Sequence, residues 1–249
     1  MLCVFIPAAG LGERLKDKTK YINKSLVNVS NQASITRIVN GYPKNTKFVI
    51  ALGFKGNYLK QYLKLAHPKL NIKFVTIKDY YSKKSGLGLT LLKSKKYLQQ
   101  PFIFHPCDTI SQSKIGDLNQ NWVGFSFCAR SENYRTISSK KKKVNFIYEK
   151  NKNYRKYPKV YTGLCGIYDF KQFWKNMEQG GSKAIKEGEV YALKKLINLK
   201  VKAIKISWLD IGNLESLENT KKILSDKNDP IILEKSNENI WFTNKYVIK

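Results

Sequence analysis

Residues 5–29, FIPAAGLGERLKDKTKYINKSLVNV, pass from an apolar run into a glycine turn and then into a basic segment. The apolar run is rich in β-branched and aromatic side chains, which predicts a buried strand. Gly10 and Gly12 permit tight backbone turns, so that backbone N–H groups of the loop can cradle phosphate oxygens. Arg14 and Lys24 add two positive charges nearby. The stretch indicates a site for a ligand with several negative charges; a plain turn with two solvated cations is the alternative.

The first part of the chain alternates short apolar runs with segments whose apolar residues recur three and four positions apart. The apolar runs predict buried strands at 2–6, 47–52, 72–77 and 101–105. The periodic segments predict amphipathic helices at 34–42, 55–66 and 88–98. This alternation predicts an α/β fold with a Rossmann-like, mostly parallel sheet flanked by helices. Such sheets bind ligands at the carboxyl ends of their strands.

The second part of the chain predicts a partly antiparallel, β-rich elaboration of this sheet. Strands are expected at 123–130, 145–150, 160–170 and 201–207, and helices at 189–197 and 214–224. The polar stretch SENYRTISSKKKKV (131–144) predicts a solvated turn. We expect one domain over 1–227, followed by a C-terminal hairpin over 228–249 whose turn is SNEN.

The chain has 249 residues and a formal net charge of +28. A basic chain can indicate a nucleic-acid or membrane-surface partner. Only five of its 46 basic residues are arginine, however, and arginine is the side chain suited to bidentate recognition of bases. The excess of lysine, with many Asn, Ile and Tyr residues, is typical of an AT-rich genome. We therefore expect no nucleic acid as the main partner, and a lysine-driven RNA-binding protein is an alternative.

Signals for membranes, secretion or structural metals are missing from the sequence. No apolar run approaches the roughly 18 residues that a membrane helix needs, and the first residues do not resemble a signal peptide. These features predict a cytoplasmic protein with no membrane partner. The four cysteines lie far apart and form no CxxC pair, which argues against a zinc site or a disulfide framework. They are predicted to be small buried side chains.

Two aspartates each follow a predicted strand. Asp108, in FIFHPCDTI, comes two residues after Pro106, and Asp210, in SWLDIGNLESL, precedes a glycine turn. Mg²⁺ binds through one or two carboxylates plus substrate phosphates, so the pair is a candidate metal site. An aspartate that caps a turn is the alternative. His105 is expected to be a neutral structural residue and not a ligand.

Two later stretches, FIYEK and VYTGL, carry polar residues that are candidates to line the same cleft from the other side. These residues are Glu149, Lys150, Tyr161, Thr162 and Gly163. Ordinary positions in a sheet are the alternative for all five.

The order and spacing of these pieces resemble the sugar-phosphate nucleotidyltransferases. In that family a strand is followed by AAGxGxRL, a lysine usually preceded by proline, a strand-end Asp, an EK pair, a glycine-containing strand and W-x-D-x-G. The corresponding pieces here are AAGLGERL, NKSLVNV, PCDTI, YEK, YTGLCGIY and WLDIG, within residues 3–224. Three features depart from the pattern: Glu13 stands at a usual threonine, Asn23 stands at the usual proline, and KSGLGLTLL (84–92) lacks the usual glutamine or proline.

The resemblance implies transfer of a nucleoside monophosphate from an NTP to a phosphorylated acceptor, with release of pyrophosphate and with Mg²⁺ as cofactor. Asp108 and Asp210 would hold Mg²⁺, Arg14 would bind the departing phosphates, and Lys24 would offset the developing charge. Contacts to the nucleotide are implied for Ala8, Ala9, Gly10, Leu11, Gly12, Arg14, Ser85, Gly86 and Pro106. Contacts to the acceptor are implied for Glu149, Lys150, Tyr161, Thr162 and Gly163.

A finer resemblance, carried by PFIF, DTI and the tail ending IWFTNKYVIK, is to nucleotidyltransferases of surface-polysaccharide synthesis. It favours CTP and a phosphorylated small metabolite, followed by UTP or dTTP with a hexose 1-phosphate. The same resemblance allows for a homodimer and for a role in making capsule precursors. A non-catalytic nucleotide-binding module of the same fold is the alternative.

Overall fold

The structure is a computed structural model that describes residues 1–82, 84–115, 117–128, 130–224, 241–242 and 247–248. Its main sheet has nine strands in the order β5-β4-β1-β6-β11-β8-β12-β10-β9. The four strands from the first part of the chain are mutually parallel. They are β1 (Cys3–Ala8), β4 (Lys47–Leu52), β5 (Asn71–Thr76) and β6 (Phe102–Phe104). All four predicted strands of this half are confirmed.

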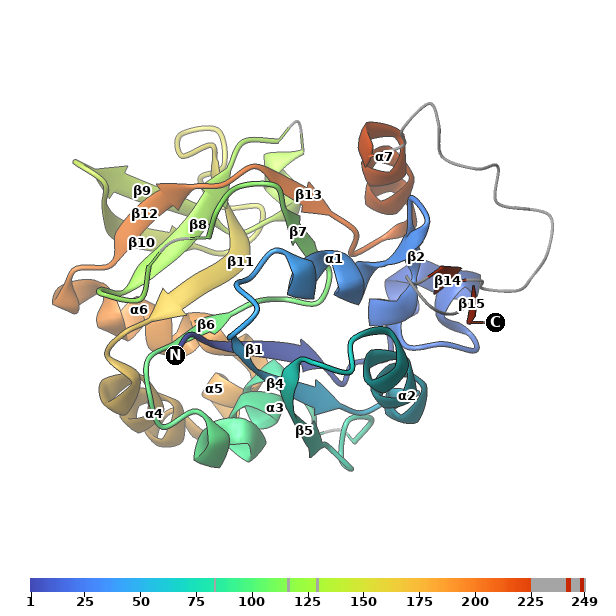
Figure 1. Cartoon of the computed structure of the whole chain (residues 1–249). Helices are drawn as coiled ribbons and strands as arrows, with labels where there is room; N and C mark the ends of the chain where they lie inside the picture. Colours follow the sequence, from blue (N-terminus) through green and yellow to red (C-terminus); the bar gives the residue numbers. More distant parts are fainter. Residues whose placement is uncertain (83, 116, 129, 225–240, 243–246, 249) are drawn as a thin grey trace.

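The other half of the sheet curls into a small barrel (Figure 1). Its strands are β8 (Trp122–Ser126), β9 (Thr136–Lys140), β10 (Lys143–Tyr148), β11 (Lys159–Ile167) and β12 (Lys202–Lys205). Because β9 pairs with both β10 and β11, these five strands close on themselves. Within the barrel only β8 and β12 run parallel, and the other pairs are antiparallel. The prediction of a mostly parallel sheet therefore holds for the first half only, while the predicted antiparallel elaboration is confirmed.

The prediction of a solvated turn at 131–144 is wrong for the middle of that stretch. Strand β9 occupies Thr136–Lys140, and the turn proper is limited to Lys141 and Lys142, both with positive φ. Thr136 and Ile137 are fully buried. One apolar residue in a serine- and lysine-rich stretch is a weak sequence signal, and the strand forms because it closes the barrel against β11.

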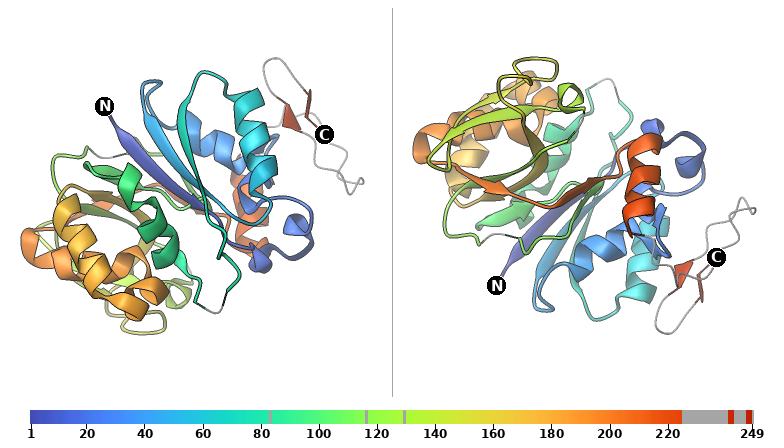
Figure 2. Two further views of the ribbon diagram at one scale, coloured as in Figure 1. Left: turned by 90° about the horizontal axis from the view of Figure 1, so that it is seen from below. Right: turned by 90° about the horizontal axis from the view of Figure 1, so that it is seen from above.

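Helices cover both faces of the sheet, as predicted (Figure 2). Two of them, α1 (Ser34–Asn40) and α2 (Gly56–Ala66), pack on one face. On the opposite face lie α3 (Leu87–Ser94), α4 (Phe170–Gln179), α5 (Gly181–Glu187) and α6 (Glu189–Leu196). Helices α4 and α5 were not predicted from the sequence. The last helix of the domain, α7 (Leu214–Leu224), has the predicted bounds and packs beside β13 and β2.

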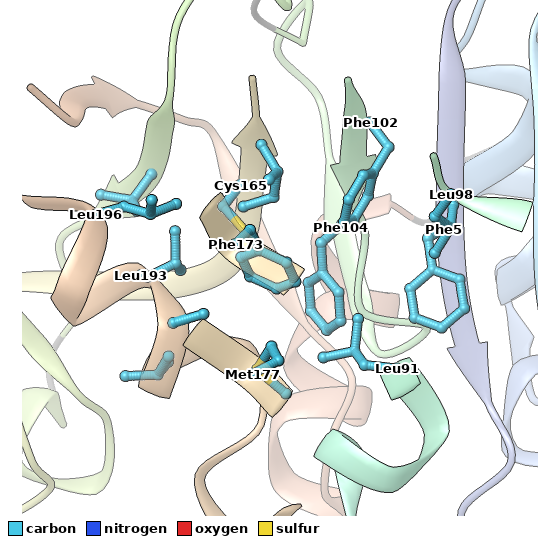
Figure 3. Packing of buried hydrophobic residues seen from close by; sticks show 14 of the residues in the cluster. Phe5, Leu91, Leu98, Phe102, Phe104, Cys165, Phe173, Met177, Leu193 and Leu196 are labelled. Carbon is cyan, nitrogen blue, oxygen red and sulfur yellow. The ribbon is translucent and has the colours of Figure 1, made fainter. Parts of the chain in front are cut away.

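Alternate residues of the central strands enter two separate cores. Phe5 of β1 packs toward α3, whereas its neighbours Val4 and Ile6 pack toward α1 and α2. Figure 3 shows the first core, where Phe5, Phe104 and Leu91 gather beside Phe173 of α4. Burial on both faces explains why β1 is apolar at every position and does not alternate.

Three short strand pairs lie outside the main sheet. They are β2 (Asn28–Val29) with β3 (Gln32–Ala33), β7 (Thr109–Ser111) with β13 (Trp208–Asp210), and β14 (Trp241–Phe242) with β15 (Val247–Ile248). The predicted SNEN turn and most of the predicted C-terminal hairpin lie outside the described residues. Among the helices that are described, none is long and apolar enough to cross a membrane.

Candidate active site

Asp108 and Asp210 lie side by side at the carboxyl edge of the parallel sheet. Asp210 ends β13 and pairs with Thr109 of β7, the residue that follows Asp108. The backbone N–H of Ile211 donates to the carbonyl oxygen of Asp108 at 3.0 Å. A carbon atom added at Gly212 would meet Asp210 Oδ1 at 3.1 Å and Asp108 Oδ2 at 3.5 Å. The two carboxylates predicted to share a metal site therefore flank one point.

Both predicted cations reach the same place. Lys24 Nζ donates to Asp108 Oδ2 at 3.1 Å, and Arg14 Nη2 lies 3.6 Å from the same oxygen. Arg14 Nη2 would also lie 3.3 Å from a carbon added at Gly212. The Lys24 side chain is 18% exposed, whereas that of Arg14 is 66% exposed. Lys24 is thus held in the wall of the site, and Arg14 is free to turn toward a ligand.

These contacts keep both the Asp108 carboxylate and the Lys24 ammonium charged. Burial by itself would raise the pKa of Asp108, but the Lys24 ammonium and then the Arg14 guanidinium outweigh it and hold that pKa below its usual value. Burial by itself would lower the pKa of Lys24, and the Asp108 carboxylate reverses this so that the pKa is raised. At neutral pH the Asp108 carboxylate and the Lys24 ammonium are therefore both charged, and the exposed Arg14 guanidinium lies beside them.

The glycine turn brings the loop after β1 against Lys24. Gly12 has a φ of 76°, in the left-handed region, and a side chain there would meet Lys24 Cβ and Thr19 Cγ2 at 3.1 Å. Thr19 Oγ1 donates to the Gly12 carbonyl at 3.0 Å. Gly10 has open space where a side chain would be. Gly12 is therefore required by the turn, and Gly10 leaves room for a ligand.

Asn23, which replaces the usual proline, holds this region together. Its Nδ2 donates to the carbonyl oxygens of Ala8, at 2.9 Å, and Phe54, at 2.7 Å. Its Oδ1 accepts from the Ser25 N–H at 2.9 Å and caps the short 3₁₀ turn that begins at Lys24. The side chain is completely buried. The sequence showed Asn23 only as a departure from the family pattern, and the structure gives it a positioning role.

A cavity of about 350 Å³ opens beside the glycine turn, and we call it the turn-side cavity. Predicted nucleotide contacts that line it are Ala9, Gly10, Arg14, Ser85, Gly86 and Pro106. The other three, Ala8, Leu11 and Gly12, line neither this cavity nor the next one described. Ala8 is buried within β1, and the departing residue Glu13 is exposed and also outside both cavities. Asp79 and Tyr80, which the sequence did not single out, complete the wall near Ser85.

A second cavity of about 720 Å³, the barrel-side cavity, lies between the barrel, β13 and α7. Four of the five predicted acceptor residues line it, namely Lys150, Tyr161, Thr162 and Gly163. Glu149 does not line it, because its carboxylate pairs with Arg135 at 3.0 Å and with Lys194. Gly163 has a φ of 84°, and a side chain there would strike Pro106 Cγ at 2.7 Å. Glycine is therefore needed where the barrel approaches the end of β6.

The barrel-side cavity is lined by three of the five arginines of the chain, Arg14, Arg130 and Arg135. Lys150 adds a fourth positive charge. Burial lowers the pKa of Lys150, and repulsion from Arg14 and Arg135 lowers it further. No carboxylate in the described part of the chain lies within ion-pair distance of Lys150. Each of the three arginines is paired with a carboxylate, whereas Lys150 is not, so Lys150 has the charge to hold a phosphate group.

Tyr134 and Trp208 orient Asp210 and were not predicted. The Tyr134 hydroxyl donates to Asp210 Oδ2 at 2.7 Å, and the Gly212 N–H donates to Asp210 Oδ1 at 3.0 Å. The ring of Trp208 packs edge-on against Tyr134 with 5.0 Å between centroids. Tyr134 lies just before β9, in the stretch predicted as a solvated turn. Its role depends on barrel closure, which the local sequence does not reveal.

The donor set suits Mg²⁺. Two carboxylates that flank one point offer the hard oxygen ligands that this ion prefers, and Asp108 Oδ2, Asp210 Oδ1 and Asp210 Oδ2 each keep a lone pair beside the hydrogen bond that they accept. Among the described residues, no three or more His, Cys, Asp or Glu side chains are grouped so as to hold a metal ion. An ion between Asp108 and Asp210 would need its remaining ligands from a substrate and from water.

His105 is held by hydrogen bonds inside the fold, and the prediction of buried cysteines is right for three of the four. His105 Nδ1 lies 2.6 Å from the Tyr42 hydroxyl and its Nε2 lies 2.9 Å from the Thr109 carbonyl oxygen. Burial lowers the pKa of His105 to about 4, so the ring is neutral. All four cysteines are free; Cys128 is half-buried and the other three are buried.

Comparisons in sequence find no protein-family model and no curated protein that match this chain. Comparison of structures finds the CTP:phosphocholine cytidylyltransferase from Streptococcus pneumoniae, with a TM-score of 0.74 and 17% identity over 90% of this chain and 100% of that one. UDP-glucose pyrophosphorylase with bound UDP-glucose matches with a TM-score of 0.71 and 17% identity, over 90% and 98% of the two chains. The inositol-1-phosphate CTP transferase from T. maritima matches with a TM-score of 0.67 and 14% identity, over 91% and 98%.

These identities are low, so the likeness concerns the fold. It extends over nine-tenths of this chain and almost all of each neighbour. The resemblance read from AAGLGERL and WLDIG is thereby confirmed at the level of the fold. The chain has the α/β fold of the nucleotidyltransferases that act on sugar phosphates and other phosphorylated small metabolites.

Proposed function

We propose that this protein transfers a nucleoside monophosphate from an NTP to a phosphorylated small metabolite or sugar 1-phosphate and releases pyrophosphate. One observation carries the proposal: Asp108, Asp210 and Arg14 converge at Gly212, and Arg14 and Asp108 line both the turn-side and the barrel-side cavity. In this proposal the turn-side cavity takes the nucleotide and the barrel-side cavity takes the acceptor.

The chemistry needs no protein nucleophile. The second pKa of a phosphate monoester is near 6, so an acceptor phosphate is already anionic at neutral pH. One of its oxygens attacks the α-phosphorus of the NTP. A new P–O bond forms while the bond from the α-phosphorus to the bridging oxygen breaks, and the electron pair leaves with pyrophosphate. The protein has to align the two substrates and neutralise their charge.

Each residue of the site has a distinct part in that task. Arg14, with its exposed guanidinium, binds the β- and γ-phosphates that depart. Lys24, held charged by Asp108, offsets the charge where the two anions meet. Asp108 and Asp210 would hold Mg²⁺, which when bound supplies positive charge beside the α-phosphate. The backbone N–H groups of the glycine turn add donors for phosphate oxygens.

Lys150 and Arg135 of the barrel-side cavity hold the acceptor phosphate. The repulsion from Arg135, which together with that from Arg14 lowers the pKa of Lys150, is relieved when an anion binds between Lys150 and Arg135. Arg135 is kept in place by its ion pair with Glu149, so the predicted acceptor residue Glu149 acts through Arg135.

CTP is the favoured nucleotide. Two of the similar structures are named for CTP, one acting on phosphocholine and one on inositol 1-phosphate. The UDP-glucose pyrophosphorylase supports UTP with a hexose 1-phosphate as the next choice. A part in surface-polysaccharide precursor synthesis, the cytoplasmic location and a homodimer remain predictions from the sequence.

A pyrophosphate-release screen tests the proposal. ATP, CTP, GTP, UTP and dTTP are each paired with a panel of phosphorylated alcohols, amino acids and sugars in the presence of Mg²⁺. We expect release with one nucleotide and one acceptor class, and none with the Asp108→Asn variant. Tight NTP binding without release for any pair would instead identify a binding module of the same fold, and the proposal would be wrong.

A further inference from the structure

Glu189 is a buried acid that the proposed chemistry does not use. It is the first residue of α6, its exposed fraction is 4%, and it lines both the turn-side and the barrel-side cavity. Among the described residues, only Arg14, Pro106 and Asp108 share that property. Glu189 therefore stands in the wall where the two substrates of the proposed reaction would meet.

One of the two oxygens of the Glu189 carboxyl group has no hydrogen-bond partner among the described residues. Glu189 Oε1 accepts a hydrogen bond from the Tyr161 hydroxyl at 3.2 Å. Oε2 is buried and has no hydrogen-bond partner in the described part of the chain. An unsatisfied buried oxygen is costly, and a bound molecule that supplies a hydroxyl group would remove that cost.

The surroundings favour the neutral form of this acid. Burial raises the pKa of Glu189 to about 7, in spite of the opposing effect of the Arg135 guanidinium. The other groups that face it are the Tyr161 hydroxyl, the Cys165 thiol and, at longer range, the Asp108 carboxylate. None of the described cations makes an ion pair with Glu189. A neutral carboxyl can both donate and accept a hydrogen bond, whereas an ionised one beside a triphosphate would repel it.

We propose that Glu189 is a specificity-determining residue whose unpaired carboxyl oxygen, Oε2, binds a ribose hydroxyl of the nucleotide. The inference rests on the proposed function. The turn-side cavity extends from Ser85 and Gly86 to Arg14 and Lys24, so a nucleotide with its phosphates at the cations has its ribose between these ends. Glu189 lines this cavity without pairing with either cation, and it thus faces the uncharged, hydroxyl-bearing part of the ligand.

The test compares CTP with 2′-deoxy-CTP and 3′-deoxy-CTP, or the matching analogues of whichever nucleotide the screen selects. Dissociation constants are measured by calorimetry for the wild type, Glu189→Gln and Glu189→Leu. We expect the wild type to bind one deoxy analogue about threefold to tenfold more weakly than the parent nucleotide, the range of one neutral hydrogen bond. Gln should keep this preference because its amide still offers a hydrogen bond, and Leu should abolish it. Equal preference in the wild type and Glu189→Leu would overturn the inference.

A second arm does not depend on the Leu variant folding. The dissociation constant for CTP is measured from pH 6 to pH 8.5 for the wild type and Glu189→Gln. We expect binding to the wild type to weaken as pH rises through about 7 relative to Glu189→Gln, because only the wild type gains a negative charge there. Parallel pH profiles would contradict the inference.

The results distinguish a failure of the ribose assignment from a failure of the proposed function. If Glu189→Leu raises the KM of the acceptor and leaves the deoxynucleotide preference intact, the residue faces the acceptor and the ribose assignment is wrong. If the folded wild type binds nucleotide but releases no pyrophosphate with any acceptor, the proposed function fails while the nucleotide-binding test stands. If it binds no nucleotide at all, both proposals fall.

Discussion

Asp210 pairs across a two-stranded ladder with Thr109, and the next amide along, that of Ile211, donates to the carbonyl oxygen of Asp108. This ladder of β7 and β13 joins the end of the parallel half of the chain to the segment that follows the barrel. Backbone hydrogen bonds therefore set the spacing of the two aspartates.

Replacing either aspartate by asparagine should abolish turnover while nucleotide binding persists. Asp108→Asn and Asp210→Asn each remove one charged oxygen ligand, and loss of one such electrostatic contact costs on the order of a hundredfold or more in rate. The measurement is pyrophosphate release in single and double variants. Because the two acids would serve one ion, the double variant should be scarcely worse than either single one. The matched control is Glu13→Gln, an exposed acid outside both cavities, and additive losses would contradict a shared site.

Tyr134→Phe should lower the affinity for Mg²⁺, and so raise the Mg²⁺ concentration for half-maximal activity, without removing activity. The hydroxyl that orients Asp210 Oδ2 is lost, while the ring that packs on Trp208 stays. Outer partners of metal ligands typically contribute about tenfold to a hundredfold in metal affinity. The readout is the Mg²⁺ concentration for half-maximal activity, with Tyr58→Phe, an exposed tyrosine of α2, as control. An unchanged Mg²⁺ profile would show that Tyr134 does not position Asp210.

Lys150→Gln should raise the KM of the phosphorylated acceptor and leave that of the NTP nearly unchanged. Lys150 lines the barrel-side cavity and is absent from the turn-side cavity. A hydrogen bond to a charged group is worth about 1.5–3 kcal/mol, or roughly a tenfold to hundredfold rise in KM. Steady-state kinetics with each substrate varied in turn separates the two effects. Lys152→Gln, at an exposed position two residues on, serves as the control, and an equal rise in both KM values would contradict the assignment.

Asn23→Ala should lower the free energy of unfolding by about 3 kcal/mol, since two buried carbonyl oxygens and one backbone N–H lose their partner. Asn23→Asp should be at least as damaging, because its carboxylate would face the carbonyl oxygens of Ala8 and Phe54. Urea denaturation measures both variants, with exposed Asn119→Ala expected within about 0.5 kcal/mol of the wild type. A loss below about 1 kcal/mol for Asn23→Ala would refute the positioning role.

Glu189→Gln should gain stability relative to the wild type as pH rises. The pKa of Glu189 is raised from 4.5 to about 7 in the folded chain, so folding binds a proton between these values. The stabilising contribution of the neutral acid is complete below pH 4.5 and is lost as pH rises through about 7, whereas glutamine does not titrate. The difference in unfolding free energy should therefore shift toward the variant by about 3 kcal/mol between pH 4.5 and pH 8. A constant difference, measured by urea denaturation at both pH values, would show that the acid is not buried in its neutral form.

Much of the first half could be predicted from local patterns. The strands around Phe5 and Phe104 are apolar at every position because helices cover both faces of the sheet, and that pattern is visible in the sequence. The same holds for the placing of Asp108, since a polar residue just after a buried parallel strand must lie at the carboxyl edge. Helix α7 was predicted with its bounds intact because its apolar residues recur with helical spacing.

The barrel and its side chains were predicted less well, for a common reason. Strand β9 and Tyr134 lie in a stretch whose composition favours a turn, and pairing with β11, which is distant in the chain, turns part of it into a strand. Glu149 was assigned to the acceptor, yet Lys194 of α6 and Arg135 draw it away from the cavity. In the sequence Glu189 is an ordinary first residue of a helix, and only the fold shows that it is buried beside Tyr161 of β11.

By itself, the sequence determined the parallel half of the sheet, the glycine turn and the four charged residues Arg14, Lys24, Asp108 and Asp210. The spacing of apolar residues and the residue types of a turn are local properties, so they can be recognised within one segment of the sequence. Only the tertiary structure decided that these charges converge at Gly212, that Asn23 holds the turn, and that Glu189 lies in a wall shared by two cavities. Those facts depend on contacts between segments far apart in the chain, and no single segment contains the information that specifies them.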